Sequence, residues 1–184
     1  DEKYLKEVQY PWISTSPQHV DAETFHRLFS SDFFDLQLAI IRHPATRYLS
    51  AFNHHRNQNN IAFYADPKRF LKKIKNFSRK DHFMYDNHFR AMSEMIPHGT
   101  TVFAIENGLD KAITFLNARM DLGIDPKLLA TANAGNYKPY RNGLRGVLKK
   151  AIQPVVPIAD DDIFRLAMEV YKNDYTAFSY TRNP

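Results

Sequence analysis

The chain has no cysteine among its 184 residues, so it can form neither a disulfide bond nor a thiolate-ligated metal site. This absence also favours a reducing compartment. Glycine is scarce: its six occurrences all follow residue 98, and no Gly-x-x-x-x-Gly-Lys-Ser/Thr loop is present to cradle nucleotide phosphates. No apolar stretch approaches the length of a membrane span, so none is expected.

What the chain does have is the composition of a globular domain. Hydrophobic residues make up 43% and charged residues 24%, which allows a real core, and the length suits a single domain over residues 1–184. The 25 lysines and arginines exceed the 20 aspartates and glutamates, which gives a net charge of +5. This balance suits an anionic ligand such as a nucleotide or an acidic glycan.

The hydrophobic pattern predicts an α/β fold. The nearly continuous apolar run 36–41 is typical of a buried parallel strand, and Asp21 is placed to cap a short helix before it. A helix from Pro44 should end in the polar stretch 57–60, with its basic last turn, 54–56, in solvent. The remaining expected elements are a helix over 67–77, a helix over 81–96, a strand over 100–105, a helix over 109–120, a mostly irregular stretch over 121–146 and a closing helix over 160–178. Alternating strands and helices favour a parallel central sheet flanked by helices on both faces.

One segment, residues 40–52, combines the features of an anion site. An apolar strand ends at Arg42, and Pro44 then suits the first turn of a helix because its missing N–H has no partner to lose. Arg47 and Ser50 are three residues apart and share one face of that helix near its N-terminus. Two guanidinium groups, a hydroxyl and a helix start can bind phosphate or sulfate, although the same pattern also suits an ordinary charged surface helix.

The string Arg-x-Pro-x-x-Arg-x-x-Ser over residues 42–50 resembles the 3′-phosphate-binding motif of sulfotransferases that use 3′-phosphoadenosine 5′-phosphosulfate (PAPS). The likeness is to the carbohydrate (Golgi-type) sulfotransferases and their bacterial relatives. In that family the first Arg and the Ser hold the 3′-phosphate of the nucleotide, and the resemblance implies this role for Arg42 and Ser50. Arg47 is a further candidate for nucleotide binding, and could instead pair with an acidic side chain.

Three other stretches resemble the same family, in the same order along the chain. Residues 86–90, followed by a strand that ends in Glu106, are similar to its His-aromatic-Arg segment and the strand after it. Residues 171–180 are similar to its C-terminal helix with Tyr, Asp-Tyr and Phe-x-Tyr, and residues 16–20 place a histidine where many relatives have one. The resemblance implies a P-loop-NTPase-like sulfotransferase fold, with PAPS as the co-substrate.

The sequence departs from the family at two points. The family's Lys/Gly/Thr-rich loop after the first strand, which cradles the 5′-phosphosulfate, has no counterpart here. We therefore expect the N-terminal strand and this phosphosulfate loop to lie upstream of Asp1 in the parent protein, so that the domain as given is N-terminally incomplete. Ala91 and Met92 stand where relatives often have Pro-Gln.

The resemblance implies that His19 and His88 lie beside the acceptor, because the family has histidines at comparable positions. Sulfuryl transfer to a hydroxyl needs a base for the departing proton, and neutral imidazole is suited to that role near pH 7. His19 is the favoured base and His88 the alternative, while either could instead be structural. His43 is expected to be only a spacer between Arg42 and Pro44. No histidines are spaced as in His-Glu-x-x-His, so no metal is expected.

A second basic segment is also a candidate for nucleotide binding. Arg141 and Arg145 lie in a Gly-containing stretch late in the chain, where relatives have a loop that closes over the nucleotide. The two arginines could reach the 3′-phosphate or an anionic acceptor. A basic loop without a ligand fits the same residues equally well.

The favoured function is PAPS-dependent sulfuryl transfer to a hydroxyl of a glycan or other small acceptor, in line and with a histidine base. The alternatives are a P-loop small-molecule kinase and a noncatalytic protein that binds nucleotide, or nucleic acid through the basic helix 67–80. Nucleic acid is not expected, because the aromatic residues of that helix have core spacing and do not form an exposed stacking row. The lack of cysteine favours a bacterial cytoplasmic enzyme over one of the Golgi lumen.

Overall fold

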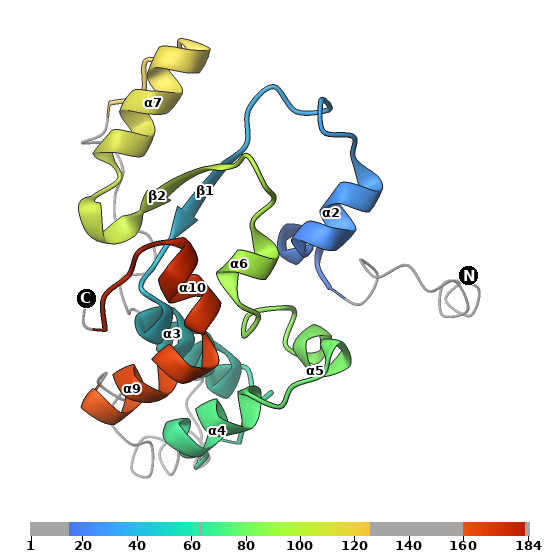
Figure 1. Ribbon diagram of the computed structural model, residues 1–184, viewed down its shortest axis with the longest axis vertical. Helices are drawn as coiled ribbons and strands as arrows, with labels where there is room; N and C mark the ends of the chain where they lie inside the picture. The colour runs from blue at the N-terminus through green and yellow to red at the C-terminus, as the bar shows by residue number, and fades with distance from the viewer. Residues whose placement is uncertain (1–14, 63, 126–159, 183–184) are drawn as a thin grey trace, which may run out of the picture.

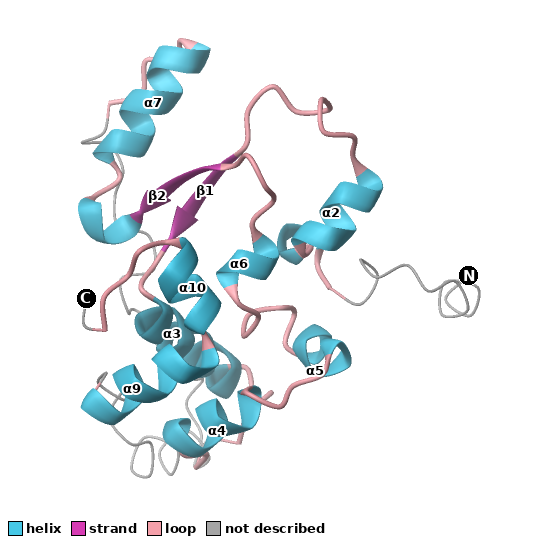
Figure 2. Cartoon of the chain, viewed as in Figure 1, coloured by secondary structure: helices cyan, strands magenta, loops and turns pink. Residues whose placement is uncertain are grey.

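The computed structural model describes residues 15–62, 64–125 and 160–182, and Figures 1 and 2 show their arrangement. Besides the 3₁₀ turns Pro17–His19 and Ile105–Asn107, these residues form, in chain order, α2 (Ala22–Leu28), β1 (Leu38–Ile41), α3 (Pro44–Asn57), α4 (Pro67–Ile74), α5 (Arg79–Met84), α6 (Met92–Met95), β2 (Thr101–Ala104), α7 (Asp110–Met120), α9 (Asp161–Val170) and α10 (Lys172–Ala177). Within these ranges, no helix combines the length and the apolar character needed to cross a membrane.

The strands β1 and β2 form a parallel pair, in which Leu38 lies opposite Thr101 and Ile41 opposite Ala104. Helices flank this small sheet (Figure 2), so the predicted α/β class is confirmed in its coarse form. The prediction that β1 is buried throughout is wrong: Ile41 is buried, but Ile40 is 44% exposed. The reason is that the described part of the sheet has only these two strands, which leaves part of its surface uncovered.

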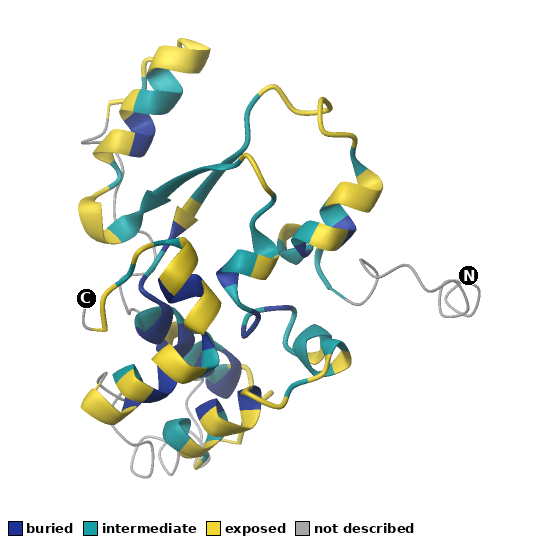
Figure 3. Cartoon of the chain, viewed as in Figure 1, coloured by how far each residue is buried: buried dark blue, intermediate teal, exposed yellow. Residues whose placement is uncertain are grey.

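The main hydrophobic core lies instead where α3, α4 and α9 pack together. These helices contact one another pairwise, and Figure 3 shows buried residues along them. Tyr48 and Phe52 of α3 are fully buried and cluster with Leu71 of α4 and Ile163 of α9. Burying an apolar side chain of this size stabilises a fold by roughly 1.5–3 kcal/mol. The helical cluster therefore stabilises the described part of the chain more than the sheet does.

Helix α3 begins directly after β1, with Pro44 in its first turn, where no N–H partner is lost. Its buried residues recur every three or four positions, as expected for a helix with one face toward the core. This face continues into the last turn, where His55 is 3% and Arg56 is 2% exposed. The prediction of a solvated basic helix end is therefore wrong. Arg56 packs over Phe52, with its guanidinium carbon 5.8 Å from the ring centroid.

Residues 81–96 form two short helices, α5 and α6, where one was predicted. Helix α5 starts with a capping box, in which Ser78 and Asp81 each bond the backbone of the other. It ends before Asp86 and Asn87, which adopt the left-handed conformation with φ of 51° and 59°. Aspartate and asparagine tolerate this conformation better than most residues do. The resulting turn brings this segment beside the first 3₁₀ turn.

The predicted closing helix is also broken, at Tyr171, into α9 and α10. Tyr171 is buried, and its hydroxyl donates a 3.2 Å hydrogen bond to the carbonyl of Phe89. Nearby, the fully buried Asp174 accepts hydrogen bonds from the backbone N–H groups of Met92 and Ser93, both at 2.8 Å. The first N–H groups of a helix have no carbonyl partner within the helix. At the start of α6, the carboxylate of Asp174 supplies that partner and attaches α6 to the C-terminal helices.

Replacing Asp174 with Ala should lower the free energy of unfolding by about 2–4 kcal/mol, because two N–H groups lose a charged acceptor. Urea unfolding followed by circular dichroism measures this loss. The exposed neighbour Asn173 offers a matched control, since Asn173→Ala should change the free energy of unfolding by less than about 0.5 kcal/mol. Native-like stability of Asp174→Ala would contradict the role assigned to this carboxylate.

Candidate functional site

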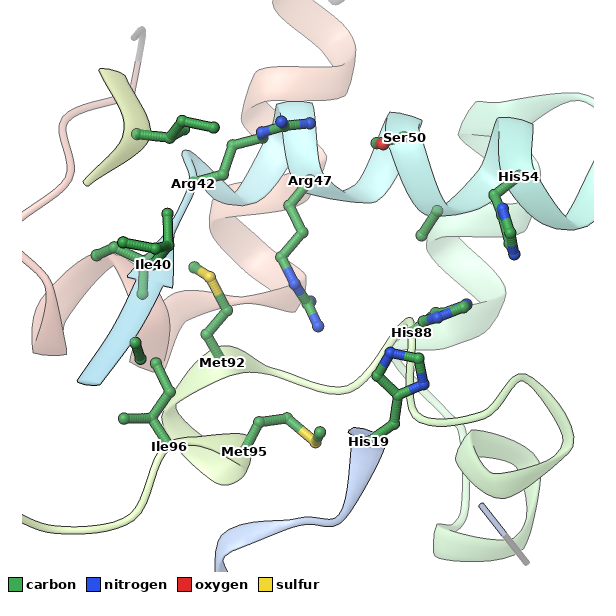
Figure 4. A pocket seen from close by; sticks show the side chains of 14 residues that line it. His19, Ile40, Arg42, Arg47, Ser50, His54, His88, Met92, Met95 and Ile96 are labelled. Atoms are coloured by element: carbon green, nitrogen blue, oxygen red, sulfur yellow. The ribbon is translucent and has the colours of Figure 1, made fainter. Parts of the chain in front are cut away.

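A cavity of about 520 Å³ opens at the carboxyl end of β1 and is lined by residues of α3 and α6. Its apolar part includes Ile40, Met92 and Met95 (Figure 4). Its polar side chains come from several segments that are far apart in the sequence: Arg42, Arg47, Ser50, His54, His19 and His88. Cationic groups and imidazole groups therefore share one space.

Arg42 and Ser50 both line this cavity, Arg42 from just before α3 and Ser50 from near the middle of that helix. Arg42 follows the last residue of β1 and is half-buried, whereas Ser50 is exposed. The side chain of the N-cap residue, His43, makes no capping hydrogen bond, and Pro44 has no N–H to offer. The positive end of the helix dipole therefore lies next to Arg42 and favours an anion there, but residues 43–46 of the first turn do not line the cavity.

Arg47 extends into the middle of the cavity (Figure 4). Its Nη1 donates a 2.7 Å hydrogen bond to the backbone carbonyl of Arg90, and among the described residues it has no ion pair with an acidic side chain. Burial lowers the pKa of Arg47, and the neighbouring Tyr171 and Asp174 partly oppose this effect. Because a guanidinium titrates far above neutral pH, Arg47 keeps its positive charge in the cavity.

His43 is fully buried and so does more than separate Arg42 from Pro44. Its backbone N–H donates to Oε1 of Glu106 at 2.6 Å, and its Nε2 lies 3.1 Å from the carbonyl oxygen of Thr181. Glu106, in the turn after β2, also accepts a 3.2 Å hydrogen bond from the hydroxyl of Tyr180 through Oε2. The two strand ends are thus tied to the C-terminal segment, which fixes the point where the chain leaves β1.

His19 lies across the cavity from Arg42 (Figure 4), and Asp86 holds its ring. Its Nδ1 is 2.8 Å from Oδ2 of Asp86 and 3.0 Å from Oγ of Ser16, whose backbone N–H donates to Oδ1 of Asp86 at 2.5 Å. In the neutral tautomer that has its proton on Nδ1, this N–H donates a hydrogen bond to the carboxylate. Nε2 then has a free lone pair that can accept a proton. Burial raises the pKa of Asp86, but the hydrogen bonds from His19 and Ser16 outweigh this and keep the pKa below its ordinary value. The carboxylate is therefore ionised at neutral pH.

Asp86 is the site residue that the sequence pattern missed. It adopts the left-handed conformation together with Asn87, which is 1% exposed and donates a 2.7 Å hydrogen bond from its side-chain amide to the carbonyl of His19. Residues other than glycine with positive φ are uncommon and often mark functional sites. The signal that could have found it is the turn-forming Asp-Asn pair directly before His88.

His88 packs against His19, with ring centroids 4.5 Å apart, and its Nδ1 lies 2.7 Å from Nε2 of His55. Burial, assisted by His19, His55 and His54, lowers the pKa of His88 to about 4. Burial also lowers the pKa of His55 to about 4, with a smaller effect from His54. Both rings are therefore neutral near pH 7.

A buried ion pair holds the segments of this site together. Nη1 of Arg90 lies 2.6 Å from Oδ2 of Asp21, and the two residues are 6% and 2% exposed. Asp21 also caps α2, as predicted, by accepting a 2.8 Å hydrogen bond from the N–H of Thr24. The pair therefore joins the helix that follows His19 to the segment that precedes α6.

The structure thus brings five of the predicted site residues to one cavity, namely Arg42, Arg47, Ser50, His19 and His88. Arg141 and Arg145 lie outside the described residues. A second cavity, of about 490 Å³, shares the three histidines His19, His54 and His88 with the first. The other polar side chains on its lining are those of Thr15, Ser16, Gln18, His55, Gln58, Asn60 and Asp86.

Cationic groups at one end of a cavity and a carboxylate-held imidazole at the other suit an enzyme that transfers an anionic group. A comparison with protein families identifies the class of protein. Residues 3–181 of this chain match the family model described as the sulfotransferase family. The chain therefore belongs to the sulfotransferase family, whose members are transferases of sulfuryl groups, and the resemblance seen in the sequence is confirmed. No protein with a curated description and no solved structure matches the chain.

Stability should fall as the pH is lowered from about 7 to 5. Burial lowers the pKa of His55, His82 and His88 from 6.5 to about 4 each. Over this range the unfolded chain binds protons that the folded protein does not bind, so acidification favours unfolding, by roughly 1–2 kcal/mol for each of these histidines. Urea unfolding at the two pH values measures the change.

Two variants provide the comparison for this prediction. His55→Gln should remove about a third of the pH dependence, because one of the three histidines no longer titrates. His98→Gln, at an exposed position, should leave the dependence intact. The same free energy of unfolding at both pH values would contradict the burial of these neutral rings.

Proposed function

We propose that this sulfotransferase transfers a sulfuryl group from PAPS to a hydroxyl of an acceptor such as a glycan, in line and with His19 as the general base. The observation that carries the proposal is the arrangement of one cavity, with Arg42 and Ser50 at one end and the His19–Asp86 pair at the other. The lack of cysteine supports a bacterial cytoplasm as the location.

The chemistry of the cationic end suits the 3′-phosphate of PAPS. Arg42, just before α3, and Ser50, near the middle of that helix, would bind this phosphate. Arg47, whose guanidinium is fixed by a backbone carbonyl, would add a second positive charge. Arg141 and Arg145 are proposed to close over the nucleotide. A P-loop-NTPase-like form of the whole domain is part of the same proposal.

PAPS, when bound, supplies the activated sulfuryl group, and the residues of the chain act on the acceptor. Nε2 of His19 takes the proton of the acceptor hydroxyl as its oxygen attacks, while the ionised Asp86 stabilises the imidazolium that forms. His88 is neutral and uses Nδ1 to contact His55, which leaves Nε2 to orient the acceptor oxygen. Holding the oxygen near the base converts an encounter in solution into a step within one complex.

The second cavity supports a hydroxyl-rich acceptor. The amide side chains of Gln18, Gln58 and Asn60 line it, and each can both donate and accept hydrogen bonds, as sugar hydroxyl groups can. It also shares His19 and His88 with the first cavity, so an acceptor seated there would reach the proposed base. These features favour a glycan over an apolar acceptor.

The alternatives raised by the sequence have less support. Nucleic-acid binding through α4 would need exposed aromatic rings, but Phe70 packs against the core, with its ring centroid 5.5 Å from that of Phe52. A small-molecule kinase is not favoured by any feature of the described residues, and the family match favours sulfuryl transfer.

The chain should bind 3′,5′-adenosine bisphosphate more tightly than 5′-AMP, because only the former carries the 3′-phosphate. Arg42→Ala should weaken binding of the bisphosphate by about tenfold or more, since a charged hydrogen bond contributes roughly 1.5–3 kcal/mol. Isothermal titration calorimetry measures both affinities. The exposed Arg69 on α4 is the matched control, and Arg69→Ala should leave both affinities unchanged. Equal affinity for the two nucleotides would reject the proposed phosphate site.

His19→Ala should lower kcat by about 10²–10⁴-fold with little change in affinity for 3′,5′-adenosine bisphosphate, because a general base acts in the chemical step. Asp86→Asn should lower kcat by a comparable factor, up to about 10⁴-fold, since an amide N–H facing Nδ1 favours the tautomer in which Nε2 already carries the proton. His88→Ala should mainly raise the KM of the acceptor. Transfer of radiolabelled sulfuryl groups from PAPS to a panel of oligosaccharides, by the full-length protein, measures these effects.

The exposed His98 is the control for loss of an imidazole, and His98→Ala should keep native activity. If His19→Ala retains near-native transfer to a productive acceptor, His19 is structural and another group is the base. If transfer proceeds only to apolar alcohols and not to oligosaccharides, the glycan part of the proposal fails while the base assignment stands.

A further inference from the structure

Three side chains of the site lie close enough together to ligate one metal ion. One ligand atom from each of His19, Asp86 and His88 lies within 4.8 Å of the others, and all three residues are half-buried. His19 is far from the other two along the chain, so their spacing gives no metal motif in the sequence. Two imidazole nitrogens and one carboxylate oxygen are a ligand set that Zn²⁺ accepts, whereas Mg²⁺ and Ca²⁺ prefer oxygen ligands alone.

We propose that His19, Asp86 and His88 bind one Zn²⁺ ion, or a cation of similar preference such as Co²⁺, with water as the fourth ligand. This proposal departs from the expectation of no metal, because that expectation came from spacing along the chain and took no account of proximity in the fold. His19 and His88 would then have two roles that cannot operate at the same time: they bind the ion in the metal-bound chain and act on the acceptor in the metal-free chain.

The distances suit a four-coordinate ion. Zinc–ligand bonds of about 2.0–2.1 Å in a tetrahedron place neighbouring ligand atoms roughly 3.3 Å apart. Nδ1 of His19 and Oδ2 of Asp86 are now 2.8 Å apart in a hydrogen bond, and all ligand atoms of the set lie within 4.8 Å of one another. Replacing the proton with the ion moves the first pair apart, and a small rotation of side chains draws the third ligand closer. As the ion binds, His19 changes to its other neutral tautomer: Nδ1 gives up its proton to solvent, Nε2 takes one up, and the lone pair of Nδ1 becomes a ligand of the ion.

Neighbouring groups already hold the ligands in place, as the outer shell of a metal site does. The backbone N–H of Ser16 donates to Oδ1 of Asp86, which leaves Oδ2 for the ion. The side-chain amide of Asn87 holds the backbone carbonyl of His19 at 2.7 Å. Nδ1 of His88 contacts Nε2 of His55 at 2.7 Å, so His88 can offer Nε2.

Metal binding has a consequence for activity that rests on the proposed function. When Nδ1 of His19 is bound to Zn²⁺, its Nε2 carries the ring proton and cannot accept the proton of the acceptor. The same ion also occupies His88, so Zn²⁺ should inhibit sulfuryl transfer. Arg42 and Ser50 lie at the other end of the cavity and are not ligands of the ion. Zn²⁺ should therefore lower kcat while affinity for 3′,5′-adenosine bisphosphate stays the same.

Calorimetric titration of the metal-free chain with Zn²⁺ near neutral pH should show one ion per chain, and Co²⁺ should give the visible absorption of a tetrahedral complex. Asp86→Asn and His88→Ala should each weaken binding by about tenfold or more, because each loses one of three protein ligands. The exposed residues His26 and His98 are the controls, and His26→Ala and His98→Ala should leave the affinity unchanged. Circular dichroism checks that each variant is folded.

The native chain gives a second measurement that needs no substitution. Zn²⁺ should shift the imidazole NMR signals of His19 and His88 and leave those of His26 and His98 in place. Absence of binding, or the same loss of affinity in His98→Ala as in His88→Ala, would overturn the metal site. Nucleotide affinity measured on the same samples tests the proposed function separately, because its failure would not affect the metal titration.

Discussion

The site depends on the buried residue Arg90, which holds three segments at once. Its guanidinium pairs with Asp21 at the start of α2, while its backbone carbonyl accepts a hydrogen bond from Arg47 on α3. The segment that contains it also carries Asp86 and His88. Both partners of the ion pair are buried, so removing either would leave an uncompensated charge. One residue thus sets the distance between the cationic part of the cavity and its histidines.

Polar contacts with the C-terminal helices position the other side of the cavity. Asp174 fixes the start of α6 through two backbone N–H groups, and Tyr180 shares Glu106 with the junction between β1 and α3. These contacts are directional, whereas the apolar cluster of α3, α4 and α9 mainly contributes burial. The fold therefore uses apolar packing for stability and buried hydrogen bonds to place the side chains of the site.

Local patterns in the sequence predicted some elements well and others poorly. The helix from Pro44, the strand after Thr100 and the cap at Asp21 follow from short-range rules, and the structure contains all three. The predictions over 81–96 and 160–178 missed a break in each helix. In the first the backbone turns at two left-handed residues, and in the second it turns where a tyrosine side chain bonds another segment. The periodicity of apolar residues reveals neither break, because the residues on both sides of each break still fit one apolar helix face.

The sequence by itself determined the cationic end of the cavity, because Arg42, Arg47 and Ser50 lie within nine residues and one strand–helix junction orders them. It also determined the family, through motifs spread along the chain in the right order. Only the tertiary structure decided that Asp86 holds His19 and that His55 and Arg56 are buried, since these depend on residues that are distant in the chain. A hydrogen bond between positions 67 residues apart leaves no periodic trace, and it forms only because the two turns are brought together by the rest of the fold.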